Sequence, residues 1–368
     1  MYNNPFFYGG IAKQDYFCNR VSELKEIRQG IYSGLNILLF APRRFGKTSL
    51  IKKVVEDKQI KYIFVDFTTI TDEKDFINSY INSFAKMLNT TDKFMHFVKD
   101  IVKLRPNVIA EFSSSGDPKF SLNFTKNDTM QTLEEVMNLP YEYAKKTDKK
   151  IVVVFDEFQE VANLKLEATL RSIIQHHSNT LSYIFLGSKK SIMSELFFNK
   201  SRPFYKSVKH LPIKSIQNDI WEKYIKDGFE KYDKEITPEH IKIILEITKG
   251  FPYYTQQLSY ELFATTDKEC NDTIVRNAIS STIEKEKSLF ALELSHLTSN
   301  QHKALRVIIK SSGKSIYRKE LLDNYNMSSS TIKRAVEALL SKDILDLEAG
   351  VYYFQDPLFE YYMKINEI

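Results

Sequence analysis

Apolar residues in the first two hundred positions gather into short runs that alternate with helical stripes. The run "NILLFA" ends at Ala41, and its continuous apolar character predicts a strand buried on both faces. The next segment, "TSLIKKVVEDK", predicts a helix whose apolar stripe consists of Leu50, Ile51, Val54 and Val55. The segments "IKYIFVDF", "KKIVVVFD", "LSYIFLGS" and "VKHLPI" predict further strands. This alternation predicts an α/β fold with a parallel sheet and helices on both faces.

The pattern changes twice along the chain, and we expect three domains: a core at 1–215, a helical lid at 216–290 and a C-terminal domain at 291–368. Within the core, two short strands around a Ser/Gly turn predict a hairpin insertion at about 106–125. This hairpin is either a surface decoration or a contact for a partner, and the sequence does not decide. The last domain combines three helices with two short strands around Gly350. It resembles a winged helix-turn-helix, whose third helix enters the major groove when DNA is bound.

Composition argues against a membrane protein, a disulfide-rich protein and a zinc-binding protein. No apolar run approaches the roughly 18 residues that span a bilayer, and no targeting segment is visible, so we expect a cytoplasmic protein without a membrane partner. Two cysteines and seven scattered histidines encode neither a disulfide framework nor a zinc site, and the adjacent His176 and His177 diverge by about 100° on a helix. The net charge of +5 is too small to indicate nucleic-acid binding by itself.

The stretch "APRRFGKTSL" follows the first strand and ends like a phosphate-binding loop, although Ala41 stands where the pattern has glycine. Its methyl group disfavours a positive φ, but we expect the loop to tolerate it because backbone amides form most of the phosphate cradle. A chance strand, turn and helix is the alternative. The predicted nucleotide-binding residues of the loop are Ala41, Pro42, Arg43, Arg44, Phe45, Gly46, Lys47, Thr48 and Ser49. Whether Arg43 and Arg44 face phosphates or solvent stays open.

Acidic and polar residues follow two other predicted strands. Asp156 and Glu157 come directly after "IVVVF", at the strand edge where α/β sheets bind ligands. We expect Asp156 and Thr48 to hold Mg²⁺, Glu157 to polarise the attacking water, and Lys47 to reach the β and γ phosphates. The alternative is that both acids cap the next helix. Ser188, after "LSYIFLG", is equally compatible with a sensor of the γ-phosphate and with a helix N-cap.

These motifs resemble the AAA+ and STAND-related ATPases, especially the archaeal-type family in which "PRRFGKTSL" precedes "hhhhDEhQ". The resemblance implies that Asn19 and Arg20 lie beside the adenine and that Pro252, in "KGFP", packs on the base. "KGFP" alone is also typical of a helix stop followed by a helix that begins with proline. The resemblance further implies that Arg202 is an arginine finger in a homo-oligomer, with a surface ion pair as the alternative.

We therefore expect an Mg²⁺-dependent ATPase that acts as a nucleotide-dependent switch, with any effector being a separate protein. The alternative is a nucleotide-controlled DNA-binding regulator that uses the winged helix, and motor activity is a weaker third option. The charge of the C-terminal domain favours DNA binding in one segment and opposes it in the next. Nine basic side chains oppose three acidic ones between Lys303 and Lys342, whereas six acidic side chains oppose one lysine beyond that point.

Overall fold

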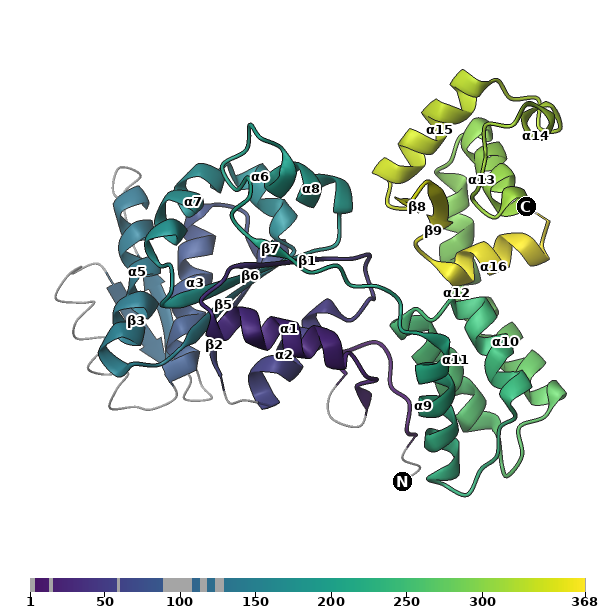
Figure 1. Cartoon of the computed structure of the whole chain (residues 1–368), viewed down its shortest axis with the longest axis horizontal. Coiled ribbons are helices and arrows are strands. Elements are labelled where there is room, and N and C mark those ends of the chain that lie inside the picture. The colour runs from purple at the N-terminus through teal and green to yellow at the C-terminus, as the bar shows by residue number, and fades with distance from the viewer. Residues whose placement is uncertain are drawn as a thin grey trace. The chain divides into compact units, whose positions relative to one another are not determined.

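The computed structural model describes residues 4–12, 16–57, 60–88, 108–112, 118–122 and 129–367, and the chain divides into two compact units (Figure 1). The core unit comprises Arg20–Ala41 and Lys47–Ile213. The helical unit comprises Met1–Asn19, Pro42–Gly46 and Lys214–Ile368. The domain boundaries at 215 and 290 stay predictions.

A parallel sheet organises the core unit. Its strand order is β2-β5-β6-β1-β7, and every neighbouring pair is parallel. The strands are β1 (Ile37–Phe40), β2 (Lys61–Asp66), β5 (Ile151–Asp156), β6 (Leu181–Gly187) and β7 (Lys209–His210). β5 and β6 are buried along their whole length, as parallel strands covered on both faces require. The α/β class predicted from the apolar runs is confirmed.

Helices cover both faces of this sheet (Figure 1). On one face, Gly30 of α1 packs on Ile37 of β1, and α2 lies beside α1. On the other face, Leu38, Ile63 and Val153 of three different strands join one apolar cluster with the remaining long helices. The helices are α1 (Val21–Tyr32), α2 (Lys47–Asp57), α3 (Glu73–Leu88), α5 (Thr129–Thr147), α6 (Val161–Leu164), α7 (Glu167–His176) and α8 (Lys190–Phe198). Single 3₁₀ turns are η2 (Phe67–Thr69) and η4 (Phe158–Glu160).

Two strands of the core unit lie outside this sheet. β3 (Val108–Phe112) and β4 (Pro118–Leu122) pair with each other in antiparallel register. The other residues of the insertion predicted at about 106–125 lie outside the described residues. Its function as a decoration or a partner contact stays undecided.

The helical unit begins with the four helices of the predicted lid and ends with a winged helix, which confirms the C-terminal resemblance. Ser328 caps the third helix of the winged helix by accepting a hydrogen bond from the Thr331 amide at 3.1 Å. Ala349 and Gly350 both have positive φ, as the tight turn of a β-hairpin requires. The elements are α9 (Asn218–Glu230), α10 (Pro238–Thr248), α11 (Pro252–Thr265), α12 (Asp272–Ser295), α13 (Ser299–Ser311), α14 (Lys319–Asp323), α15 (Ser329–Ser341), β8 (Leu345–Glu348), β9 (Val351–Phe354) and α16 (Pro357–Ile365).

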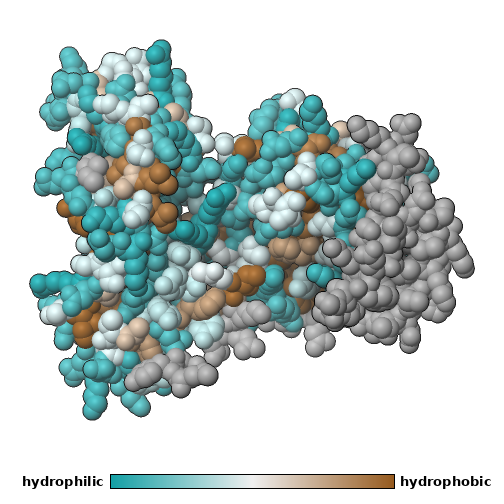
Figure 2. Space-filling model, turned by 180° about the vertical axis from the view of Figure 1, so that it is seen from behind, coloured by the Kyte–Doolittle hydropathy of each residue, from teal (hydrophilic) through white to brown (hydrophobic). Residues whose placement is uncertain are grey.

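The face shown in Figure 2 is mostly hydrophilic, with hydrophobic residues in separate patches. In the part of the chain that the structure describes, no helix has both the length and the apolar character needed to cross a membrane.

Candidate functional site

The loop after β1 needs no glycine at position 41. Ala41 has an ordinary φ, and the positive φ values of the loop fall on Arg44, at 67°, and on Gly46, at 80°. The Ala41 amide donates to the Gly187 carbonyl at 3.3 Å, which ties the end of β1 to the end of β6. The methyl group is therefore compatible with the loop, because the conformation that glycine favours occurs three and five residues later.

Lys47 and Thr48 begin helix α2 directly after this loop. The Lys47 ammonium donates to the Ala41 carbonyl at 2.7 Å, and the residue is 5% exposed. The Thr48 hydroxyl donates to Asp156 Oδ2, also at 2.7 Å. Burial raises the pKa of Asp156 above its ordinary value, and the hydrogen bond from Thr48 partly offsets this effect. The two residues predicted to hold Mg²⁺, 108 positions apart in sequence, are thus in direct contact.

The chemistry of this pair fits magnesium. A hydroxyl and a carboxylate are oxygen ligands, which Mg²⁺ prefers, and Mg²⁺ sites of phosphate-transferring proteins use one or two carboxylates together with substrate oxygens. Among the described residues, no group of three or more His, Cys, Asp or Glu side chains could hold a metal by itself. The residues therefore suit a metal that arrives with a phosphate ligand.

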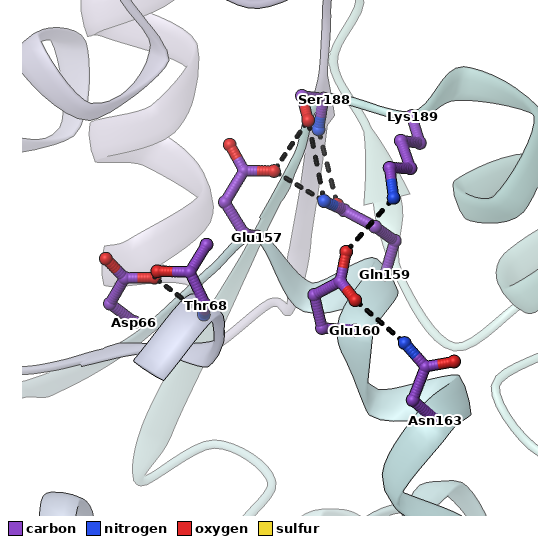
Figure 3. Close-up of polar contacts among 8 residues, drawn as sticks. All are labelled: Asp66, Thr68, Glu157, Gln159, Glu160, Asn163, Ser188 and Lys189. Carbon is purple, nitrogen blue, oxygen red and sulfur yellow. Dashed lines mark hydrogen bonds and ion pairs between the residues drawn. The ribbon is translucent and has the colours of Figure 1, made fainter. Parts of the chain in front are cut away.

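Glu157 does not cap the following helical turn. It precedes η4 without a side-chain capping bond, so the capping alternative is wrong for this residue. Its backbone is left-handed, with φ 49° and ψ 44°. Its Oε2 atom accepts hydrogen bonds from Ser188 Oγ at 2.6 Å and from Gln159 Nε2 at 2.5 Å (Figure 3).

Ser188 lies at the end of β6, and its hydroxyl is committed to Glu157 rather than to a helix end. The N-cap position of α8 belongs to Lys189, whose side chain makes no capping bond. The N-cap interpretation of Ser188 is therefore wrong. Sequence reasoning missed Gln159, although it is the glutamine of the "DEFQ" stretch. Its contact with Ser188 joins residues 29 positions apart, and no local pattern encodes such a contact.

Two predicted site residues of the core unit form ion pairs with near neighbours. The Arg202 guanidinium pairs with Glu167 at 2.5 Å, and the two side chains are 31% and 12% exposed. Arg20 is buried and pairs with Glu23 at 2.8 Å. Asn19 and Arg20 both have positive φ directly before α1. The ion pair that was the alternative for Arg202 is thus present, and the finger and adenine contacts stay predictions.

In the helical unit, loop residues Arg44 and Phe45 pack on the start of α11. Arg44 donates to the Tyr254 hydroxyl at 3.1 Å, and its guanidinium carbon lies 4.5 Å from the centroid of the Tyr253 ring. The rings of Phe45 and Phe251 meet edge to face, with centroids 4.6 Å apart.

Arg44 also reaches the winged helix. Its guanidinium lies 3.7 Å from the Asp356 carboxylate, which in turn accepts hydrogen bonds from the Leu358 and Phe359 amides at the start of α16. Arg44 therefore contacts protein groups of its own unit although its side chain is 41% exposed, and Arg43 is exposed as well. Of the other loop residues, Pro42 and Ser49 are buried.

Pro252 is the first residue of α11. Lys249 ends α10 in the left-handed conformation, and Gly250 follows with φ 68°. This is the geometry of a helix stop followed by a helix that begins with proline. A contact between Pro252 and a base stays a prediction.

Comparison with known families assigns both parts of the chain. Residues 17–258 match the model of an ATPase domain predominantly from Archaea, and residues 288–365 match that of a probable winged helix domain. The comparison with curated proteins returned no match.

Solved structures share the fold at low sequence identity. The Walker-type ATPase of Pyrococcus abyssi is 16% identical, with a TM-score of 0.67, and the match covers 96% of this chain and 97% of that chain. The ORC2 protein of Aeropyrum pernix, solved as ADPNP–ADP complexes, is 14% identical with a TM-score of 0.57, covering 97% and 96%. At these identities the likeness concerns the fold alone. Because the family model spans most of the chain, this protein belongs to the family of ATPase domains found predominantly in Archaea.

Proposed function

We propose that the chain binds ATP with Mg²⁺, hydrolyses it to ADP and phosphate, and acts as a nucleotide-dependent switch of the STAND kind. The observation that carries this proposal is the contact between Thr48 and Asp156, directly beside Lys47 and Glu157 in sequence. A hydroxyl at a helix N-terminus and a carboxylate at a strand end are what a phosphate-bound metal needs.

Binding in this proposal uses the loop, the helix N-terminus and the ammonium group. The amides of the loop and of α2 donate to the phosphates, and Lys47 leaves the Ala41 carbonyl for the β and γ phosphate oxygens. Thr48 and Asp156 hold Mg²⁺, which when bound neutralises charge on the phosphate oxygens. Asn19, Arg20 and Pro252 are assigned to the adenine by family resemblance alone.

Hydrolysis in this proposal depends on Glu157 as the general base. Its carboxylate accepts a proton from the attacking water, a role that contributes about 10²- to 10⁴-fold to rate in enzymes. Ser188 donates its one hydroxyl proton to that carboxylate, so in this proposal it senses the γ-phosphate indirectly, through Glu157. Arg202 is offered to a neighbouring subunit's nucleotide, where a positive charge stabilises the transition state.

The decisive experiment compares ATP turnover and nucleotide affinity in Lys47→Ala and Lys52→Ala proteins. Lys47→Ala should lower turnover at least about 100-fold, because it removes a charge aimed at the phosphates. Lys52→Ala is the matched control, since it removes a lysine of the same helix whose ammonium lies over the Phe64 ring. Normal turnover and affinity in Lys47→Ala would contradict the proposal.

A DNA-binding regulator is the second candidate, and the surface of α15 favours it. Lys333 and Arg334 are exposed side by side on this helix. Among the acidic residues that follow, Asp346 is 7% exposed and accepts from the Tyr353 hydroxyl, and Glu360 is 7% exposed and pairs with Lys364. Two of the six acidic residues beyond Lys342 are therefore mostly buried, which weakens the repulsion of phosphates that the sequence indicates, although Glu348 of the wing is exposed.

A further inference from the structure

Gln159 stands at the centre of the polar cluster that surrounds Glu157 (Figure 3). The residue is 2% exposed and belongs to η4, which Glu157 separates from the end of β5. Its Nε2 atom donates to Glu157 at 2.5 Å and lies 3.4 Å from Ser188 Oγ, while its Oε1 atom accepts from the Ser188 amide at 3.3 Å. One buried amide thus connects the ends of β5 and β6.

The orientation of this amide is determined by its partners. The Ser188 backbone N–H can only donate, so it requires the oxygen of the Gln159 amide on its side. The nitrogen of the amide must then face the Glu157 carboxylate, which as an anion can only accept. Neither glutamate nor an apolar residue of similar size could satisfy both neighbours.

Glu157 needs such support because its backbone is unusual. The left-handed conformation of a non-glycine residue costs about 1 kcal/mol or more, and it persists where surrounding contacts determine it. Gln159 and Ser188 both donate to the same atom, Oε2, and the other carboxylate oxygen points away from them (Figure 3). The two donors therefore fix the direction in which that second oxygen is presented.

We propose that Gln159 is a positioning residue for ATP hydrolysis, which aims the Glu157 carboxylate at the attacking water and locks it to Ser188. This inference rests on the proposed function, because it assigns Gln159 a role in the same reaction. Gln159 acts through Glu157 rather than on the nucleotide. Its loss should consequently affect the chemical step and leave ATP binding unchanged.

The test measures kcat, KM for ATP, affinity for a non-hydrolysable ATP analogue and melting temperature in Gln159→Met and Gln159→Glu proteins. Methionine has a similar volume and no amide, and glutamate keeps an acceptor but places a second negative charge beside Glu157. We expect kcat to fall at least about tenfold in both, with KM and analogue affinity within about twofold, since general-base catalysis is worth about 10²- to 10⁴-fold.

Asn163→Ala is the matched control. It removes the hydrogen bond that Asn163 donates to Glu160, the neighbouring carboxylate in the same cluster (Figure 3). This variant should leave kcat unchanged. If the first two variants fail to fold, Gln159→Asn keeps a polar group in the buried space with a side chain one methylene shorter, and the same fall in kcat is expected.

Two results would overturn the inference. One is an unchanged kcat in a folded Gln159 variant, and the other is a parallel loss of kcat, analogue affinity and melting temperature, which indicates a merely structural role. An unsubstituted protein that binds ATP without turning it over would instead contradict the proposed function.

Discussion

His177 is a residue whose sequence position concealed its role. The adjacent His176 and His177 raised the question of a metal site. The imidazole of His177 is buried, however, and contacts the Tyr183 hydroxyl and Asn138 Oδ1, both at 2.7 Å. Its ring stacks on Tyr141 and on Tyr183. Burial, with a smaller contribution from the charge of His176, lowers the pKa of His177 to about 4.

This lowered pKa predicts a loss of stability in mild acid. In the unfolded chain the His177 imidazole takes up a proton near pH 6.5. In the folded chain it takes up a proton only near pH 4. The stabilisation is therefore complete above pH 6.5 and is lost as the pH falls from 6.5 towards 4. Between pH 7 and 5 the free energy of unfolding should drop by about 2 kcal/mol because of this group.

Urea unfolding at both pH values measures this drop. His177→Gln should reduce it, whereas His176→Gln, which changes the exposed neighbour and removes only the smaller cause of the lowered pKa, should reduce it much less. An equal drop in the His177→Gln protein would show that other groups cause it.

At the scale of elements, DNA binding by helix α15 would distinguish between the two functions proposed for the chain. Its N-terminus is capped by Ser328, and its exposed face carries Lys333 and Arg334. A recognition helix of a winged helix-turn-helix contacts DNA through such a face. If α15 binds DNA, its two charges neutralise phosphates and displace counterions.

Binding to a mixed-sequence DNA duplex should then weaken steeply with salt. Replacing Lys333 and Arg334 by glutamine should lower the slope of log affinity against log salt by about 2, one for each phosphate contact. Lys364→Gln is the control, because that lysine is committed to Glu360 in α16. Absence of binding at low salt in every nucleotide state would eliminate the DNA-binding function.

The elements were predictable from sequence because their signals are local. Short apolar runs predicted the five parallel strands, and the order of helices and strands predicted the winged helix. The contacts of the site depend on which strand ends meet, and this follows from the strand order. Gln159 lies 29 residues from Ser188, and Arg44 lies more than 200 residues from Tyr254, so no sequence spacing revealed either contact.

At the scale of the whole molecule, Arg202 bears on whether this protein works as a monomer or as an assembly. In the structure it pairs with Glu167 of its own chain. Such a partly exposed pair contributes about 1 kcal/mol or less to stability, so releasing Arg202 to a neighbouring subunit would cost little.

The assembly hypothesis predicts complementation between two inactive proteins. Arg202→Ala keeps its phosphate loop and Lys47→Ala keeps its arginine, so a mixture should turn over ATP faster than the sum of its components. Glu167→Gln breaks the ion pair without removing Arg202 and should retain turnover. Mass measurement with a non-hydrolysable ATP analogue should show an oligomer. A monomeric mass in every nucleotide state would restrict Arg202 to its ion pair.

The ordinary φ of Ala41 has a consequence for how relatives of this chain are recognised. Ala41 contributes its backbone amide, which donates to Gly187, and its carbonyl, which accepts from Lys47. The residue itself is buried, with 5% of its surface exposed. The backbone at this position suits alanine and other non-glycine residues, because its φ is not positive. Sequence patterns that demand glycine at the start of the loop will therefore overlook ATPases whose phosphate site is otherwise complete.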